Sequence, residues 1–220
     1  MNPNKTFSLR TASALLAALA ATTVLSACAP LLIGGAIVGG SMVATDRRTS
    51  GTQVDDQAIE LKGIKRVNDT IGDRGSVSVT SYNRIALLTG TTTSEVDKAA
   101  VERSISAIEN VRSVINEIAV GTASSFGNRS NDTYLTSKVK ASIVDTKDIQ
   151  VNAFKVVTER GIVYLMGRVT ERESNRAADI ARGVGGVQKV VKVFEVVTEA
   201  ELADLQPKAA AVAASAPAKP

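Results

Sequence analysis

The sequence predicts an α+β protein made of two tandem copies of one small domain, each with the element order αββαβ. The first observation is an internal repeat with an offset of 76–77 residues, and each copy has about 70 residues, the size of a small domain. The second is hydrophobic patterning that alternates between helical and strand periods within each copy. The third is a composition of 44% hydrophobic and 22% charged residues, which is typical of a folded protein.

The two copies align through residues of the same type at the same place in the unit. The correspondence is clearest in an apolar stretch that ends at a glycine, and it continues upstream and downstream with one single-residue gap. The aligned pairs include Asp56 with Asp132, Ile85 with Ile162, Leu88 with Leu165, Gly90 with Gly167, Ala100 with Ala177 and Val114 with Val190.

Each copy begins with an amphipathic helix and continues with two strands that form a hairpin. The first strand of copy one alternates Ser or Thr with Val from position 76 to 80, and its counterpart in copy two is a β-branched run. The second strand of each copy is apolar, and the glycine after it is expected to break the pattern. We expect the helices at 54–68 and 132–144, the first strands at 76–80 and 151–158, and the second strands at 84–89 and 161–166.

A second helix and a last strand complete each copy. The pairs Thr92 with Glu95 and Thr170 with Glu173 have the spacing of a capping box, which favours a helix start. An alanine-rich helix follows, long enough to cross over and bring the last strand into parallel pairing. The result is a three-stranded mixed sheet packed against two helices. We expect the last strands at 111–120 and 187–197.

The N-terminal segment resembles the signal peptide of a bacterial lipoprotein. Lys5 and Arg10 precede an uncharged apolar run that ends in Leu-Ser-Ala-Cys28, a match to the lipobox whose cysteine is lipidated. Several acyl chains on Cys28 would anchor the protein stably, because each buried CH₂ contributes about 0.8 kcal/mol. Ala29 stands where Asp resembles a signal for inner-membrane retention, so the outer membrane is expected. The alternative is an ordinary secretory signal.

Composition excludes several classes of site. The chain has no His and one Cys, which removes His-based triads, imidazole zinc sites and intrachain disulfides. A net charge of +4 and 3% aromatic residues do not argue for nucleic acid. Asp55 and Asp56 are interpreted as acids that favour a helix N-terminus, and the glycines at 183–186 as a helix end rather than a phosphate cradle. We therefore expect no enzyme, cofactor or metal.

The element order, the glycine after the hairpin and the Val-rich last strand resemble the BON domain. Two copies behind a lipobox are similar to the dual-BON outer-membrane lipoproteins of Gram-negative bacteria, and the stretch Leu165–Glu173 carries the most specific likeness. The expected division is a signal peptide at 1–27, a lipidated N-terminus and linker at 28–52, BON domains at 53–121 and 131–198, a linker at 122–130, and a disordered Ala/Pro-rich tail at 199–220.

The first helix of copy two presents two different faces. On a helical wheel Leu135, Val139 and Ile143 cluster as a core face. The opposite face carries an aromatic ring and small groups beside two cations, the pattern of a helix that lies on anionic lipid. An exposed helix with scattered apolar residues, or packing against copy one, would produce the same pattern. The outward residues are Tyr134, Ser137, Lys138, Lys140, Ala141 and Val144.

The resemblance implies that this helix binds anionic phospholipid, through the positions of Tyr134, Lys140, Ala141 and Val144. Tyr134 stands where such relatives carry a larger aromatic residue. The expected protein is a non-enzymatic lipoprotein of the outer membrane that faces the periplasm, supports envelope integrity and could gather at the division site. The alternatives are an adaptor for outer-membrane assembly or cell-wall remodelling machinery, and a periplasmic hydrolase or hydrolase regulator.

Overall fold

The computed structural model describes residues 46–122 and 125–205. The expected signal peptide at 1–27, Cys28, most of the 28–52 segment and the tail beyond residue 205 lie outside the described residues.

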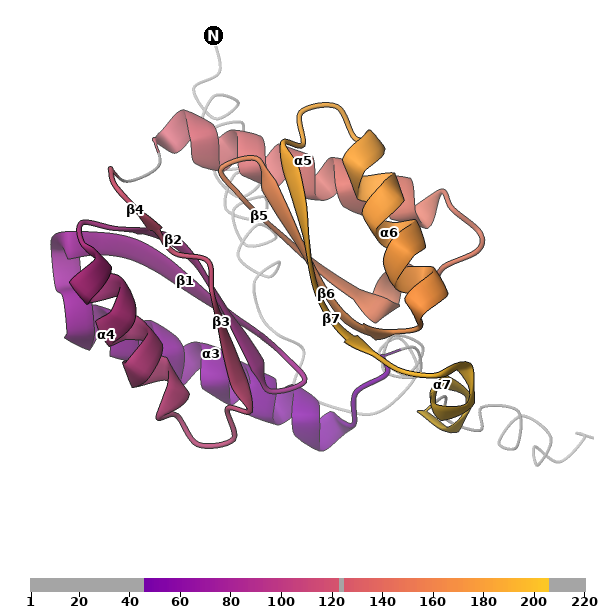
Figure 1. Ribbon diagram of the computed structural model, residues 1–220, viewed down its shortest axis with the longest axis horizontal. Helices are drawn as coiled ribbons and strands as arrows, with labels where there is room; N and C mark the ends of the chain where they lie inside the picture. Colours follow the sequence, from indigo (N-terminus) through magenta and orange to yellow (C-terminus); the bar gives the residue numbers. More distant parts are fainter. Residues whose placement is uncertain (1–45, 123–124, 206–220) are drawn as a thin grey trace, which may run out of the picture. The chain divides into compact units, whose positions relative to one another are not determined.

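Two αββαβ units follow one another along the described chain (Figure 1). The first contains α3 (Ser50–Ile71), a short 3₁₀ turn η2 (Gly72–Arg74), β1 (Gly75–Tyr82), β2 (Ile85–Thr92), α4 (Glu95–Ser106), β3 (Ser113–Asn116) and β4 (Ala119–Val120). The second contains α5 (Phe126–Val144), η3 (Val151–Ala153), β5 (Phe154–Glu159), β6 (Ile162–Val169), α6 (Glu171–Gly183), β7 (Lys189–Val196) and an added helix α7 (Glu199–Leu205).

Both sheets have the predicted mixed topology. In each unit the first two strands pair antiparallel as a hairpin, and the third strand pairs in parallel with the second. The sheet of the first unit gains a fourth short strand because its last strand is divided into β3 and β4, both of which pair with β2. The predicted α+β class, with helices beside a mixed sheet, is confirmed.

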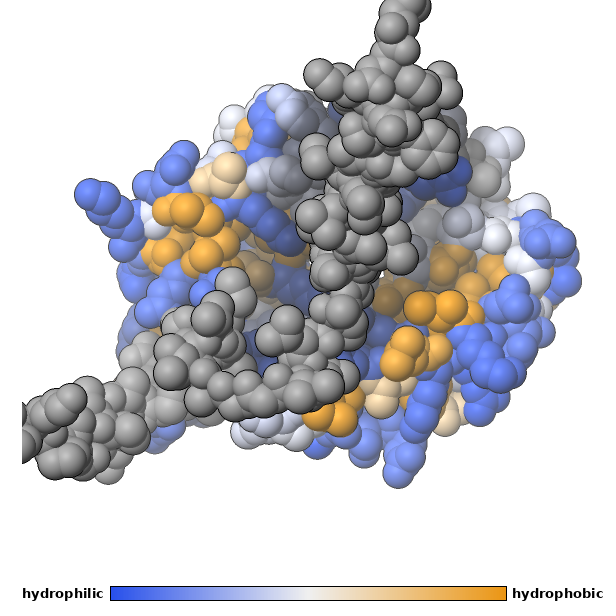
Figure 2. Space-filling view, turned by 180° about the vertical axis from the view of Figure 1, so that it is seen from behind, coloured by the Kyte–Doolittle hydropathy of each residue, from blue (hydrophilic) through white to orange (hydrophobic). Residues whose placement is uncertain are grey.

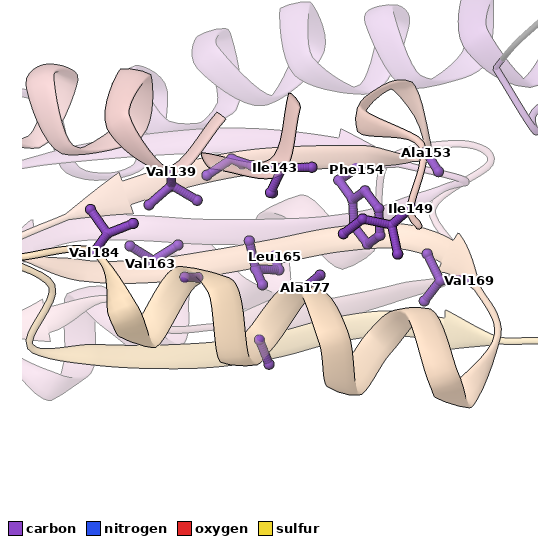
Figure 3. Close-up of a cluster of buried hydrophobic side chains, with 13 residues drawn as sticks. Val139, Ile143, Ile149, Ala153, Phe154, Val163, Leu165, Val169, Ala177 and Val184 are labelled. Carbon is purple, nitrogen blue, oxygen red and sulfur yellow. The ribbon is translucent and has the colours of Figure 1, made fainter. Parts of the chain in front are cut away.

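Each unit has its own hydrophobic core between its two main helices and one face of its sheet. In the second unit, Val139 and Ile143 of α5 and Ala177 of α6 point toward Val163 and Leu165 of β6 (Figure 3). The equivalent cluster of the first unit joins α3, α4 and their sheet through Ile59, Ile71, Ala86, Leu88, Val101 and Ile105.

A third cluster joins the two sheets through the faces that the helices leave uncovered. Tyr82 and Leu87 of the first unit meet Tyr164, Met166 and Val193 of the second, all of them buried. Because neighbouring residues of a strand point to opposite faces, Leu87 serves this cluster and Leu88 serves the core of its own unit. Both faces of the central strands are therefore buried, which explains their almost continuous apolar sequence.

Gly90 and Gly167 lie inside β2 and β6, so the expectation that they break the strands is wrong. A Cβ on Gly90 would lie 2.1 Å from the backbone oxygen of Ser76, and a Cβ on Gly167 would lie 2.4 Å from that of Ala153. Gly90 also has φ of +115°, which side chains rarely adopt. The glycines permit close approach of the hairpin partner and do not end the strand.

The helix starts agree with the sequence in one copy and differ in the other. Thr170 and Glu173 form the predicted capping box of α6. In copy one the N-cap is Ser94, whose hydroxyl accepts from the Asp97 amide, because β2 continues through Thr92. Helix α5 begins at Phe126, within the expected linker, where the Ser125 side chain caps it.

Residues 199–205 form helix α7, so the expectation of disorder is wrong for this part of the 199–220 segment. Helix α7 begins after Thr198, whose hydroxyl accepts from the amide of Glu201 while the Glu201 carboxylate accepts from the Thr198 amide. Leu202 of this helix is buried. A reciprocal cap and one buried leucine therefore stabilise this helix.

Candidate functional site

The structure places the six predicted lipid-facing residues away from the core of their domain. Leu135, Val139 and Ile143 are fully buried, as the helical wheel predicts. Tyr134 is 62% exposed and Val144 is 61% exposed, high values for side chains of this kind. The others share this outward face, with Lys138 half-buried and Ser137, Lys140 and Ala141 exposed.

The two lysines of this face have different surroundings. The Lys138 ammonium donates to the Gly185 carbonyl at 2.9 Å and lies 5.5 Å from the centre of the Tyr134 ring. These contacts hold a positive charge beside an exposed aromatic ring. Lys140 has no hydrogen-bond or ion-pair partner within the described part of the chain, so its charge is available to a ligand.

A shallow pocket of about 290 Å³ lies beside Lys140. Its other lining residues are Asp46, Val151, Asn152 and Phe154, which come from the start of the described chain and from the segment that enters β5. Asp46 is held there by Arg48, whose guanidinium donates to both oxygens of the carboxylate. The first described residue therefore lies next to the candidate lipid-binding helix.

Helix α3 carries an exposed apolar surface of a different character. Ile59 and Val67 are buried, but Val54, Leu61 and Ile64 are each at least 60% exposed. These three residues project from one side of the helix, at about 0°, 340° and 280° on a wheel that starts at Val54. The neighbouring lysines are paired with acids, Lys62 with Glu109 at 3.6 Å and Lys65 with Asp69 at 2.6 Å.

The outer surface therefore combines apolar and hydrophilic areas. Seen from behind, separate hydrophobic patches are set among hydrophilic atoms (Figure 2). Such patches, where they are larger than scattered single residues, are typical of surfaces that meet lipid or another protein.

The aligned acids Asp56 and Asp132 are structural, which corrects the helix-dipole interpretation of Asp56. Asp56 is buried in the second turn of α3 and accepts from the backbone amides of Asn83 and Arg84 at 2.8 and 2.7 Å. Asp132 binds the amides of Arg160 and Gly161 at 2.8 Å in the same way. Both residues of each hairpin turn, Asn83 with Arg84 and Arg160 with Gly161, have positive φ. Each carboxylate therefore stabilises a turn whose backbone conformation is otherwise unfavourable.

The sequence gives no hint of the most buried ion pair. Arg47 is 5% exposed, and its guanidinium donates to both oxygens of Glu173 at 2.7 and 2.8 Å. Burial alone would raise the pKa of Glu173, but the bonds from Arg47 and from the Thr170 amide outweigh it, and the net shift is downward. The capping box identifies Glu173 as a helix-start residue, but no spacing rule joins it to Arg47, 126 residues away.

The described residues contain neither a metal-binding cluster nor a helix that could span a membrane. No group of three His, Cys, Asp or Glu side chains in residues 46–122 and 125–205 could hold a metal ion. In the same part of the chain, no helix is both long and apolar enough to cross a membrane.

Comparisons with known proteins agree with the duplicated fold. The family model of the BON domain matches residues 55–122 and 131–198. The chain is 38% identical over 179 residues to the outer membrane lipoprotein DolP of Haemophilus influenzae. The aligned region covers 80% of this chain and 92% of that protein. It is 30% identical to a 21 kDa hemolysin of Actinobacillus pleuropneumoniae, over 69% of this chain and 79% of the relative.

A third relative is similar over the same part of the chain at lower identity. The osmotically-inducible protein Y of Escherichia coli is 28% identical over 155 residues, 69% of this chain and 77% of its own length. The two matched regions coincide with the two αββαβ units seen in the structure. The chain belongs to the BON-domain family, in which it is a dual-domain relative of outer-membrane lipoproteins.

Proposed function

We propose that this outer-membrane lipoprotein is anchored through Cys28, faces the periplasm and binds anionic phospholipid through the outer face of α5, in support of envelope integrity. The observation that carries the proposal is the exposure of Tyr134 and Val144 beside Lys140, which has no partner among the described residues. An aromatic ring and an aliphatic side chain can insert at the level of the headgroups while the lysines meet phosphate. Each lysine near an anionic surface contributes about 1 kcal/mol.

Vesicle co-sedimentation tests the proposal. The unlipidated mature chain, residues 28–220 with Cys28→Ser, is mixed with zwitterionic or anionic vesicles at low and moderate salt. We expect binding to anionic vesicles alone, weakened by salt because exposed charges are screened within about 10 Å at 0.1 M. Tyr134→Ala with Val144→Glu should abolish it, and Lys140→Ala should weaken it by about fivefold, the equivalent of one lysine.

A matched control keeps the test specific to α5. Leu61→Ala with Ile64→Glu makes the same kind of change on α3 and should leave vesicle binding intact. Thermal melting of each variant checks that the fold persists. Equal binding by the wild type and the folded Tyr134/Val144 variant would show that α5 is not the lipid site.

A second candidate function is that of an adaptor for outer-membrane assembly or cell-wall remodelling machinery. It is favoured by the exposed aliphatic side chains of α3, whose neighbouring lysines are already paired with acids. An apolar centre with a rim of both charges suits a protein better than an anionic membrane. If the Leu61/Ile64 variant loses co-purifying envelope proteins while keeping lipid binding, this second role is supported.

A further inference from the structure

The first helices of the two copies differ at one aligned position that faces the neighbouring strand, Glu60 on α3 and Thr136 on α5. Each residue comes four positions after the aligned aspartate of its copy, Asp56 or Asp132. Each also contacts the first strand of its own hairpin, β1 or β5, which forms an edge of its sheet. The duplicated fold therefore shows the same strand edge once with a carboxylate beside it and once without.

In copy one, Glu60 closes the edge of β1. Its Oε1 atom accepts from the backbone amide of Ser81 at 2.8 Å and from the Lys155 ammonium at 2.6 Å. The same ammonium donates to the Ser81 carbonyl at 3.1 Å. Both backbone groups of Ser81 therefore point away from β2 and are satisfied by side chains, so this part of the edge offers nothing to a further strand.

In copy two, the corresponding edge is open. Thr158 of β5 has the register of Ser81, because each is the second residue before its two-residue hairpin turn. The Thr158 amide and carbonyl therefore face outward as well. Thr136 does not bind them, since its hydroxyl donates to the Thr158 hydroxyl at 2.7 Å. In the part of the chain that the structure describes, no side chain bonds to either backbone group of Thr158.

Space for an external group lies at this edge. A pocket of about 330 Å³ is lined by residues 156–159 of the strand and by the side of α5 that carries Arg129 and Thr136. Arg129 is exposed, and its guanidinium has no hydrogen-bond or ion-pair partner among the described residues. It can therefore supply to this pocket the positive charge that Lys155 supplies in copy one.

Two acids also line the pocket, and neither closes it to an anion. Asp132 is already bound by two amides of the hairpin turn. Glu159 alternates with Thr158 along β5, so its side chain is directed to the opposite face of the sheet. Copy one accommodates the same combination, because Glu60 binds the strand edge in the presence of Asp56, which is bonded in the same way as its counterpart.

We propose that the groove between α5 and β5 is a peptide-binding site, which takes an extended acidic segment of a partner protein as an added strand beside β5. The segment pairs through its backbone with the outward groups of Thr158. One of its carboxylates takes the place that Glu60 has in copy one, beside Arg129. Strand addition draws affinity from main-chain hydrogen bonds and specificity from side chains at alternate positions.

This site is separate from both surfaces considered above. Arg129 and Thr136 lie about 150° around α5 from Tyr134, so the groove is not the lipid-facing side of the helix. It is also in the second copy, whereas the exposed aliphatic side chains of the adaptor surface are on α3. The inference therefore goes beyond the proposed function and does not depend on lipid binding.

Amide resonances of the isotope-labelled chain, residues 28–220 with Cys28→Ser, test the site. The probes are pools of blocked peptides of about seven residues, with a central glutamate or glutamine between varied β-branched residues. We expect the glutamate pool to shift the Thr158 amide signal and the glutamine pool to bind about tenfold more weakly, because a charged acceptor forms the stronger hydrogen bond. Acetate and inorganic phosphate should leave the signal in place, because neither can pair with a strand.

Thr136→Glu should close the groove from within, because its carboxylate can bind the Thr158 amide as Glu60 binds the amide of Ser81. Peptide binding should then fall at least tenfold, while hydrogen exchange of the Thr158 amide slows about tenfold and the melting temperature does not fall. Thr136→Ala is the matched control, since it removes the hydroxyl without filling the pocket and should bind the peptides as the wild type does.

The charge of the pocket is tested separately. Arg129→Ala should weaken binding of the glutamate pool about fivefold and leave binding of the glutamine pool unchanged. Arg66→Ala removes an exposed arginine from α3 and should change neither.

Three results would overturn the proposal. The first is a Thr158 amide that does not move with the glutamate pool at about 1 mM, the weak end of the affinity range. The second is an equal shift with acetate or phosphate, which would make the pocket a simple anion site. The third is undiminished peptide binding by folded Thr136→Glu. Lipid binding by α5 is read from vesicle sedimentation, so failure of one proposal is distinguishable from failure of the other.

Discussion

At the scale of single residues, the best-explained side chains are the two aligned aspartates. Asp56 and Asp132 occupy the same place in their copies and accept from two backbone amides of the following hairpin turn. Hydrogen bonds to a charged acceptor contribute more than neutral ones, and a buried amide without an acceptor pays its full desolvation cost. Each aspartate therefore joins a helix to a turn 27–29 residues further along the chain.

Asp132→Ala should lower the free energy of unfolding by about 3 kcal/mol, because it leaves the amides of Arg160 and Gly161 without their charged partner. Urea denaturation followed by circular dichroism measures the change. Asp69→Asn is the control, since that acid pairs with exposed Lys65 and should cost less than about 0.5 kcal/mol. A small effect of Asp132→Ala would mean that water can replace the carboxylate.

At the scale of elements, close packing of the hairpin strands decides where glycine is required. Gly90 lies in β2 opposite Val77, and the space that a Cβ would need is taken by the Ser76 carbonyl. Gly167 makes the same close approach in β6. The repeat of this feature in both copies shows that it belongs to the fold of the unit and not to either site.

Gly90→Ala should destabilise the protein by about 3 kcal/mol, because overlap with the backbone adds to strain at positive φ. Gly183→Ala is the matched control. It lies at the end of α6, where an added Cβ would meet nothing within 4 Å among the described residues, so it should be neutral or stabilising by up to about 1 kcal/mol. Thermal melting of both variants distinguishes steric overlap from a general sensitivity to losing glycine.

The elements also show what a sequence can and cannot predict. The order αββαβ, the parallel third strand and the buried face of α5 follow from local periodicity and connection length, and all were predictable. The N-cap at Ser94 was missed because Thr92 is the residue followed after three positions by the glutamate of a capping box, whereas it belongs to a strand whose end depends on its partner β1. The contact of Arg47 with Glu173 was missed because long-range pairing leaves no periodic trace.

At the scale of the whole described chain, the cluster between the sheets joins two units that otherwise have complete cores of their own. Tyr164 is central to it and is 2% exposed. Burial raises the pKa of Tyr164 to about 12, with a further contribution from the Glu117 carboxylate of the first unit. The phenol is therefore held neutral, because ionisation would place a charge between the sheets.

The sign of this shift predicts loss of stability in alkali. The folded pKa lies above the ordinary value of 10.0, so the stabilisation is complete below pH 10 and is lost as the pH rises toward 12. Tyr164→Phe should flatten the decline of unfolding free energy with pH by up to about 2 kcal/mol. Denaturation curves between pH 9 and 12 measure it, with Tyr134→Phe, an exposed tyrosine, as control. Parallel declines in all three proteins would place the alkaline sensitivity elsewhere.

The burial of both faces of the central strands β2 and β6 limits where the two units can evolve new contacts. The apolar residues of these strands belong to the three clusters, so the surfaces most open to change are the outer sides of the helices and the sheet edges. There the copies have diverged, with Tyr134 and the exposed Lys140 on α5 but aliphatic side chains and paired lysines on α3. The two units thus share one type of core but differ on the outer faces of α3 and α5. These faces can change independently, so one chain can carry two binding specificities.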